Sequence, residues 1–280
     1  SGTTFDRLAT ALAVRRARGG GPLTILSCDN LPGNGDAARA ATIAAAERTG
    51  DGLAAWVRES CTFPNSMVDR ITPVTTPDMI ERLNADFGVQ DAWPVSSEPF
   101  VMWVLEDDFS DGRPPLELVG VQLVEDVSPY EAMKLRLLNG SHSTLAYLGY
   151  LLGHEFLWQA ASDPLLGTLI ERMMAIEVVP TLDVPRGVDV AGYCAQLLAR
   201  FRNPALPHRT QQIAMDASQK LPQRLLGTVR DRIEHGAPIR HLALAVAGWI
   251  RYASGTDEAG AAIAVSDPLT GEFKRIAQAA

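Results

Sequence analysis

The chain has 280 residues, a length that predicts one large or two modest domains. Hydrophobic residues make up 46% of it and charged residues 21%, a balance typical of a globular protein and not of a disordered or membrane chain. There are 25 lysines and arginines against 33 acidic residues, so the net charge is −8. A surface of that sign repels a phosphate backbone, and nucleic acid is therefore not an expected partner.

Motif spacing argues against several other classes. The three cysteines, Cys28, Cys61 and Cys194, are odd in number and have no C-x-x-C spacing, so neither a disulfide framework nor a zinc ribbon is expected. No H-E-x-x-H or G-x-S-x-G motif occurs, which leaves zinc catalysis and a hydrolase serine without support. The longest apolar run, residues 242–250, is shorter than the roughly 20 residues that cross a bilayer. We expect a protein of a reducing cytoplasm that binds neither a metal nor a membrane.

The first half of the chain alternates helix and strand patterns. A helix is predicted at 5–18, and the apolar segment 23–28 is predicted to be a strand. The following turn leads to Asp36, the expected N-cap of an alanine-rich helix that ends at residue 49. The other elements expected here are strands at 70–74, 100–105 and 116–124 and a helix at 77–87. Such alternation predicts an α/β sheet.

From residue 128 onward, amphipathic helical patterns follow one another with short Gly/Pro punctuation. The helices are expected at 130–153, 164–178, 188–202, 223–234 and 238–253. We place the domain boundary near residues 125–130. Residues 1–125 are then an α/β portion, and residues 126–280 are an all-helical portion.

A glycine-rich string follows the first predicted strand. Residues 33–38, Gly-Asn-Gly-Asp-Ala-Ala, fit the G-x-G-x-x-A pattern of a dinucleotide site between a strand and a helix. Such a site also needs a second strand that ends in an acidic residue about 20 positions on, whereas here another helix follows Gly52. The string therefore favours a plain loop and helix cap over a pyrophosphate site.

Two loops at strand ends offer candidate ligand contacts. Asn30 lies at the carboxyl end of the first predicted strand, where open α/β sheets bind their ligands. Its amide could donate to a substrate oxygen, or it could cap a turn, as Asx residues at strand ends usually do. The neighbouring Asp69 and Arg70 fit a ligand contact or a surface ion pair equally well.

Three polar residues share one sector of the otherwise apolar helix that begins near residue 130. At about 100° per residue, Lys134, His142 and Asn139 fall at about 0°, 80° and 140°. Burial lowers the pKa of a lysine and makes its amine a usable general base, while amide and imidazole groups can hold an oxygen that becomes anionic. A solvated helix start explains the same residues, so the pattern leaves a catalytic site and a surface helix equally open.

Five strings in the chain form a recognisable series. They are LSCDNLPGNG (26–35), FPNSMVDRITPVT (63–75), SEPFVMWVLEDDF (97–109), KLRLLNGSHS (134–143) and RTQQIAMDASQKLPQR (209–224). In this order they resemble the polyol-specific long-chain dehydrogenases, which include mannitol 2-dehydrogenase and the fructuronate and tagaturonate reductases. The resemblance extends over essentially the whole chain.

The resemblance implies a zinc-independent, NAD(H)-dependent interconversion of a secondary alcohol and a ketone on an open-chain sugar, with NADP(H) left open. It implies that Lys134 is the general acid/base, that Asn30 and Asn139 donate to the reacting oxygen, and that His142 orients the substrate. Glu131 would tune Lys134 or relay its proton, although an ordinary helix-surface ion pair fits this residue too.

Further contacts to cofactor or substrate hydroxyls are implied for Val68, Asp69, Arg209 and Lys220. A sugar acid, as in the uronate reductases, would need a positive partner such as Arg209 or Lys220 for its carboxylate, whereas a neutral polyol needs none. An alternative of another class is a non-redox sugar-binding or sugar-isomerising module, which would bind sugar with no nicotinamide dependence.

The members of this family begin with a complete dinucleotide-binding half that contains a glycine-rich loop, and this chain starts downstream of that loop. We therefore expect residues 1–125 to be the remaining part of a Rossmann-like domain with an incomplete sheet. Residues 126–280 are expected to be the helical substrate domain. The chain by itself is expected to bind NAD poorly.

Overall fold

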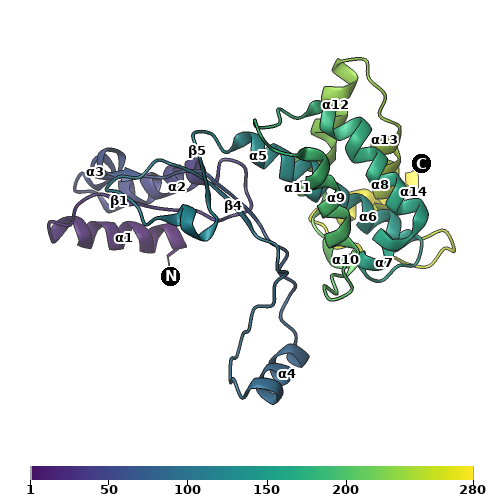
Figure 1. The fold of residues 1–280 in the computed structure, drawn as a ribbon, viewed down its shortest axis with the longest axis horizontal. Helices are drawn as coiled ribbons and strands as arrows, with labels where there is room; N and C mark the ends of the chain where they lie inside the picture. Colours follow the sequence, from purple (N-terminus) through teal and green to yellow (C-terminus); the bar gives the residue numbers. More distant parts are fainter. Residues whose placement is uncertain (1, 280) are drawn as a thin grey trace. The chain divides into compact units, whose positions relative to one another are not determined.

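The computed structural model describes residues 2–279, which divide into two compact units (Figure 1). The first unit consists of the residues up to Ile71 together with Ser97–Glu131, and the second consists of Thr72–Ser96 and the residues from Ala132 on. All five strands of the described chain lie in the first unit, and the second is helical. None of the described helices is long and apolar enough to cross a membrane.

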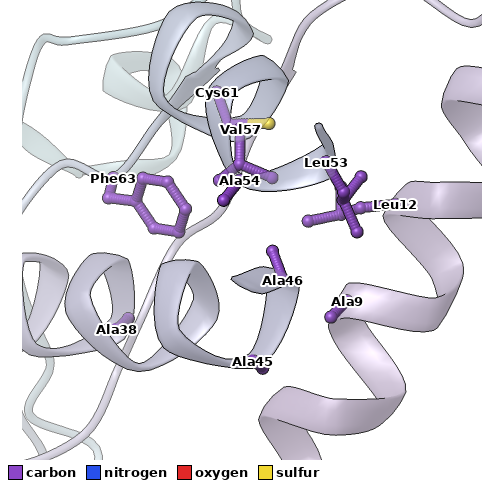
Figure 2. Close-up of a cluster of buried hydrophobic side chains, with 10 residues drawn as sticks. All are labelled: Ala9, Leu12, Ala38, Ala45, Ala46, Leu53, Ala54, Val57, Cys61 and Phe63. Carbon is purple, nitrogen blue, oxygen red and sulfur yellow. The ribbon is translucent and has the colours of Figure 1, made fainter. Parts of the chain in front are cut away.

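Three helices of the first unit pack on one another: α1 (Thr4–Ala17), α2 (Asn34–Thr49) and α3 (Leu53–Ser60). Alanines on α1 and α2 let these helices approach closely, and larger side chains from α1 and α3 fill the space between them. The buried cluster is shown in Figure 2 and consists of Ala9, Leu12, Ala38, Ala45, Ala46, Leu53, Ala54, Val57, Cys61 and Phe63.

The strands of the first unit are short and form two sheets. β1 (Leu23–Thr24) pairs in parallel with β2 (Cys61–Thr62). In the second sheet β4 (Met102–Glu106) lies between β3 (Ser66–Asp69), which is antiparallel to it, and β5 (Gln122–Val124), which is parallel. The N-terminal part is therefore α/β, as the alternation of elements predicts.

The predicted strand bounds need three corrections. The segment 23–28 pairs as a strand only at Leu23–Thr24, and the chain beyond it forms a loop. The strand expected at 70–74 lies earlier, at Ser66–Asp69, because Pro73 has no N–H to give to a ladder. Residues Leu116–Val119 form a 3₁₀ turn, η1, before β5.

The N-terminus of α2 is also capped differently from the expectation. The helix begins at Asn34, behind Gly33 at φ 61°, so Asp36 lies in the first turn and is not the N-cap. Gly33 has no side chain with which to cap the helix. The N–H groups of Gly35 and Asp36 instead donate to Oδ1 of Asn65, at 2.8 and 3.1 Å.

The helix predicted at 77–87 is confirmed as α4 (Pro77–Phe87). The hydroxyl of Thr76 accepts from the N–H of Met79 at 3.4 Å, and Pro77 occupies the first helical position, where its missing N–H costs nothing. Gly88 ends the helix at φ 66°. Local signals at both ends explain why the sequence predicts these bounds.

The helical unit is built around α6 (Gly140–Leu151), most of whose side chains are buried. An apolar helix that is buried on all faces forms the centre of a helical core. Its neighbours are α7 (Leu157–Ser162), α8 (Pro164–Arg172), α10 (Thr210–Ile213) and α13 (Arg240–Ala253). The other helical segments are η4 (Val179–Thr181), α9 (Val190–Phe201), α11 (Ala217–Leu221), α12 (Gly227–Glu234) and α14 (Thr270–Ala279). The helix α5 (Ser128–Met133) begins in the first unit and ends in the second.

Three of the helices that the periodicity predicts as continuous contain a π-helical segment. These segments are η2 (Lys134–Asn139), η3 (Met173–Val178) and η5 (Pro222–Leu226), and η2 contacts both of the others. A β-carbon on Gly140 would lie 2.8 Å from the carbonyl oxygen of Arg224, so glycine permits the close approach of η5. π-helical turns are rare and frequently occur at functional sites.

Candidate active site

The polar trio of the helical unit is buried. Lys134 and Asn139 are each 7% exposed and His142 is 6% exposed. Burying a lysine, asparagine or histidine costs free energy, because the polar group loses its hydrogen bonds to water and must find partners inside the protein. This burial contradicts the alternative of a solvated helix start.

The π-helical backbone changes the geometry that the sequence predicts for the trio. On an ideal α-helix, Lys134 and Asn139 would point about 140° apart. The segment that they bound is π-helical, and its i→i+5 hydrogen bonds set residues five apart nearly above one another. The π turn therefore brings these two side chains closer to a common direction than the α-helical period does.

His142 is packed among aromatic rings. Its ring centroid lies 4.7 Å from that of Phe201 and 6.0 Å from that of His208, which meets it edge-on. Burial lowers the pKa of His142 well below 6.5, and the positive charges of His208, Arg224 and Arg200 lower it further. The imidazole is therefore neutral at pH 7, with one ring nitrogen as donor and the other as acceptor.

Three polar atoms near this ring system are buried and lack a hydrogen-bond partner among the described residues. They are Oδ1 of Asn139, Nε2 of His142 and Nδ1 of His208. Buried polar atoms are normally paired, and leaving one unpaired costs about 1–3 kcal/mol. A polyhydroxylated molecule supplies both donors and acceptors, so a sugar or polyol can pair with the amide oxygen and with ring nitrogens of either tautomer.

Two further residues of this region, His208 and Arg224, are not among the candidates that the sequence provides. Arg224 donates to Oγ of Ser143 at 3.2 Å, and burial lowers its pKa. Burial also lowers the pKa of His208, with a smaller contribution from the charge of Lys220. The sequence signals for Arg224 are its place at the end of the string 209–224 and its position four residues after Lys220.

The two cationic candidates, Lys220 and Arg209, have different surroundings. Nζ of Lys220 donates to the carbonyl of Met215 at 2.6 Å, and burial lowers its pKa, with a further contribution from Arg224. Arg209 forms an exposed ion pair with Glu155, and its guanidinium lies 5.3 Å from the centroid of the Phe156 ring. Lys220 therefore belongs to the electrostatic environment of His208, whereas the partners of Arg209 lie on the surface.

The remaining candidates belong to the first unit. Asn30 is exposed in the loop that follows β1. Val68 is half-buried in β3, and Asp69, which ends this strand, is only 2% exposed. A buried carboxylate at a strand end fits a partner that donates hydroxyl hydrogens.

The first turn of α2 does not fit a pyrophosphate. Oδ1 of Asn65 accepts from the N–H groups of Gly35 and Asp36, and Glu131 accepts from the N–H of Gly33. A β-carbon on Gly35 would lie 2.3 Å from the carbonyl oxygen of Phe63, so this glycine serves close packing and not phosphate approach. The structure therefore favours the loop-and-cap interpretation of residues 33–38.

Glu131 has a structural partner within the first unit. Both carboxylate oxygens accept from the N–H of Gly33, at 3.2 and 3.3 Å. This contact ties the start of α2 to α5.

Both parts of the chain match a known family. Residues 2–118 match the mannitol dehydrogenase Rossmann domain, and residues 126–280 match the mannitol dehydrogenase C-terminal domain. The chain belongs to the mannitol dehydrogenase family.

Individual relatives are similar along nearly the whole chain. D-mannonate oxidoreductase of Escherichia coli is 49% identical over 96% of this chain and 55% of its own length. Mannitol 2-dehydrogenase of Pyrenophora tritici-repentis is 45% identical over 97% of this chain and 49% of its own length. A solved ternary complex of Pseudomonas fluorescens mannitol 2-dehydrogenase with NAD and D-mannitol is 41% identical, with a TM-score of 0.85 over 98% of this chain and 56% of that one. The chain thus spans about half the length of the relatives it matches.

Proposed function

We propose that the protein catalyses the NAD(H)-dependent, zinc-independent interconversion of a polyol and a ketose, of the mannitol/fructose type. Residues 126–280 supply the substrate and catalytic domain. Residues 1–125 supply a Rossmann-like cofactor domain. The matches of residues 2–118 and 126–280 to two different domains of the family support this division.

The observation on which the proposal rests is the buried trio on and beside the π turn. Lys134, Asn139 and His142 are all less than one tenth exposed, and Lys134 is the buried lysine of the described residues. Structural lysines lie on surfaces, where the ammonium is hydrated at no cost. A lysine buried beside an amide and a neutral imidazole suits proton transfer to and from an alcohol.

The chain's own residues have distinct roles in this reaction. Nζ of Lys134 takes the hydroxyl proton during oxidation and returns it during reduction. The side-chain amides of Asn139 and Asn30 donate to the oxygen as it gains negative charge, and neutral His142 orients a neighbouring hydroxyl. Glu131 is the proposed relay for the proton of Lys134.

For the cofactor, we propose NAD, with NADP as the alternative. A bound nicotinamide would supply the hydride acceptor. Asp69, at the end of β3, would contact hydroxyls of the cofactor or of the substrate, with Val68 beside it in the strand. The first turn of α2 does not hold the phosphates, because its N–H groups are bonded to side chains of the chain itself.

A second candidate substrate is a sugar acid, as in fructuronate or tagaturonate reduction. The observation that favours it is the set of positive charges around His142 and His208, namely Arg200, Arg224 and Lys220. Cationic side chains in a partly buried environment bind a carboxylate through charge-assisted hydrogen bonds. The relative named D-mannonate oxidoreductase is consistent with this substrate class.

The test is NADH oxidation by the protein at the length its gene encodes, with D-fructose and D-fructuronate offered separately. Turnover of D-fructose supports the neutral polyol, and turnover of D-fructuronate alone supports the sugar acid. Sugar binding that does not depend on a nicotinamide would instead favour a non-redox binding or isomerising module.

A further inference from the structure

Asn34 forms a hydrogen-bonded junction inside the first unit. It is the first residue of α2 and is 1% exposed. Its Nδ2 lies 3.1, 3.0 and 2.9 Å from the carbonyl oxygens of Ser27, Asp29 and Ser66, which share its two N–H groups. Its Oδ1 accepts from the N–H of Ser66 at 2.9 Å. One side chain therefore binds the loop after β1 and the start of β3 together.

This pattern is not that of a helix cap. A capping asparagine accepts from N–H groups of its own helix, and in α2 the side chain of Asn65 has that role. The hydrogen-bond partners of the Asn34 amide, Ser27, Asp29 and Ser66, lie outside α2. The amide group is the only neutral side chain with both the two donors and the acceptor that this arrangement uses.

The segments that Asn34 joins are those of two candidate contacts. Ser27 and Asp29 directly precede Asn30 in the loop, and Ser66 opens the four-residue strand that ends at Val68 and Asp69. The hydroxyl of Ser66 also donates to the carbonyl of Ser27. The buried side chain of Asn34 therefore holds the backbone of both the loop before Asn30 and the start of β3.

We propose that Asn34 is a positioning residue, which sets the loop that contains Asn30 at a fixed distance from the strand that contains Val68 and Asp69. This inference rests on the proposed function, in which those residues contact the reacting oxygen and the cofactor. Misplacing a substrate-contacting group by about 1 Å can lower a rate by about 100-fold. Asn34 therefore affects turnover without touching the substrate.

The test compares Asn34→Ala with Asn65→Ala in the protein at the length its gene encodes. Both substitutions remove a buried or half-buried amide at the start of α2, but only the first releases the loop before Asn30. We expect kcat of Asn34→Ala to fall by about 10- to 100-fold, and that of Asn65→Ala to stay within about threefold. Circular dichroism and urea unfolding establish that each variant is folded. A folded Asn34→Ala with kcat within threefold of the unsubstituted protein overturns the proposal.

A double-mutant cycle separates positioning from stability. If Asn34 acts through Asn30, kcat of the Asn30→Ala/Asn34→Ala double variant should lie within about threefold of Asn30→Ala alone. Losses that multiply contradict the proposal.

Ser66→Ala is the milder variant to use if Asn34→Ala does not fold. It removes only the hydroxyl that bonds Ser27 and lies 3.3 Å from Nδ2 of Asn34. We expect a fall in kcat of several-fold, and an unchanged kcat overturns the proposal. Normal turnover by both Lys134→Ala and Asn30→Ala is a different result, because it rejects the proposed function itself.

Discussion

His142 shows at the scale of one residue how burial sets chemistry. Its pKa in the folded protein lies well below the 6.5 of an unperturbed histidine, first because of burial and then because of nearby positive charge. Between those two pKa values the unfolded chain binds more protons than the folded one, so stability rises with pH. The stabilisation is complete above pH 6.5 and is lost as the pH falls towards the folded-state pKa.

We therefore expect His142→Gln to flatten the pH dependence of stability. In the unsubstituted protein this group contributes a slope of up to about 1.4 kcal/mol per pH unit below pH 6.5. Urea unfolding at several pH values between 5 and 7.5 measures the slope for both proteins. Replacement of the exposed His235 by Gln is the control, because it removes an imidazole outside the buried site. Equal slopes for the unsubstituted protein and His142→Gln would show that folding does not lower the pKa of His142.

At Gly35, the packing of the surrounding backbone leaves no room for a side chain. A β-carbon there would lie 2.3 Å from the carbonyl oxygen of Phe63 and 2.6 Å from that of Pro64, and neither backbone atom can move away freely. We expect Gly35→Ala to lower the free energy of unfolding by about 1–3 kcal/mol. Gly21→Ala, whose β-carbon meets nothing within 4 Å, should be nearly neutral. Equal midpoints of urea unfolding for the two variants would contradict the packing argument.

The sequence predicts which residues form the trio, but it does not predict that they are buried. The spacing of Lys134, Asn139 and His142 marks them as candidates, but a solvated helix has the same spacing, and only the packing of distant segments buries them. Arg224 reaches Ser143 across 81 positions of sequence, and Asn34 reaches Ser66 across 32. Such contacts leave no periodic signal along the chain.

At the scale of elements, local signals decide which bounds are predictable. Thr76, Pro77 and Gly88 mark the ends of α4, and the prediction agrees with the structure. The β3 strand is missed because it begins at polar residues whose partners are far away in sequence. The π segments are missed because a period of 3.6 residues describes the flanking helices and is insensitive to one wider turn.

The packing of η2 against η5 gives a prediction for Gly140. A β-carbon at this position would lie 2.8 Å from the carbonyl oxygen of Arg224, which forces the two π segments apart. We expect Gly140→Ala to lower stability by about 1–3 kcal/mol and kcat by about tenfold, because Asn139 and Lys134 lie on the displaced turn. Steady-state kinetics and urea unfolding measure the two effects.

Gly227→Ala is the matched control for that substitution. Its β-carbon would make an ordinary contact, 3.5 Å from the carbonyl oxygen of Pro222. Both measured quantities should stay close to those of the unsubstituted protein. A Gly140→Ala variant that behaves like this control would show that the π segments adjust without affecting the site.

At the scale of the whole molecule, the chain combines an α/β unit with a helical unit and spans about half the length of its relatives. Composition and element order predict these two classes of structure. They do not reveal that Thr72–Ser96, which includes α4, belongs to the helical unit, because that assignment depends on contacts between segments far apart in the chain.

The hydrogen bonds at the start of α2 predict weak cofactor binding by residues 1–280. The N–H groups there are bonded within the protein, so this helix end offers no phosphate site. We expect NADH to bind the 280-residue chain at least about 100-fold more weakly than it binds the Pseudomonas fluorescens mannitol 2-dehydrogenase, whose solved complex contains NAD, which corresponds to about 2.7 kcal/mol. Quenching of tryptophan fluorescence on titration with NADH measures both affinities, and equal affinities would contradict the expectation.

The central claim is that Lys134 exchanges the proton of the reacting hydroxyl. The most direct measurement is kcat of Lys134→Ala with the preferred ketose and NADH, beside Lys274→Ala, which removes an exposed lysine of α14. We expect Lys134→Ala to lose about 10²- to 10⁴-fold in kcat with its fold intact, and Lys274→Ala to match the unsubstituted protein. Near-normal turnover by a folded Lys134→Ala would contradict the account.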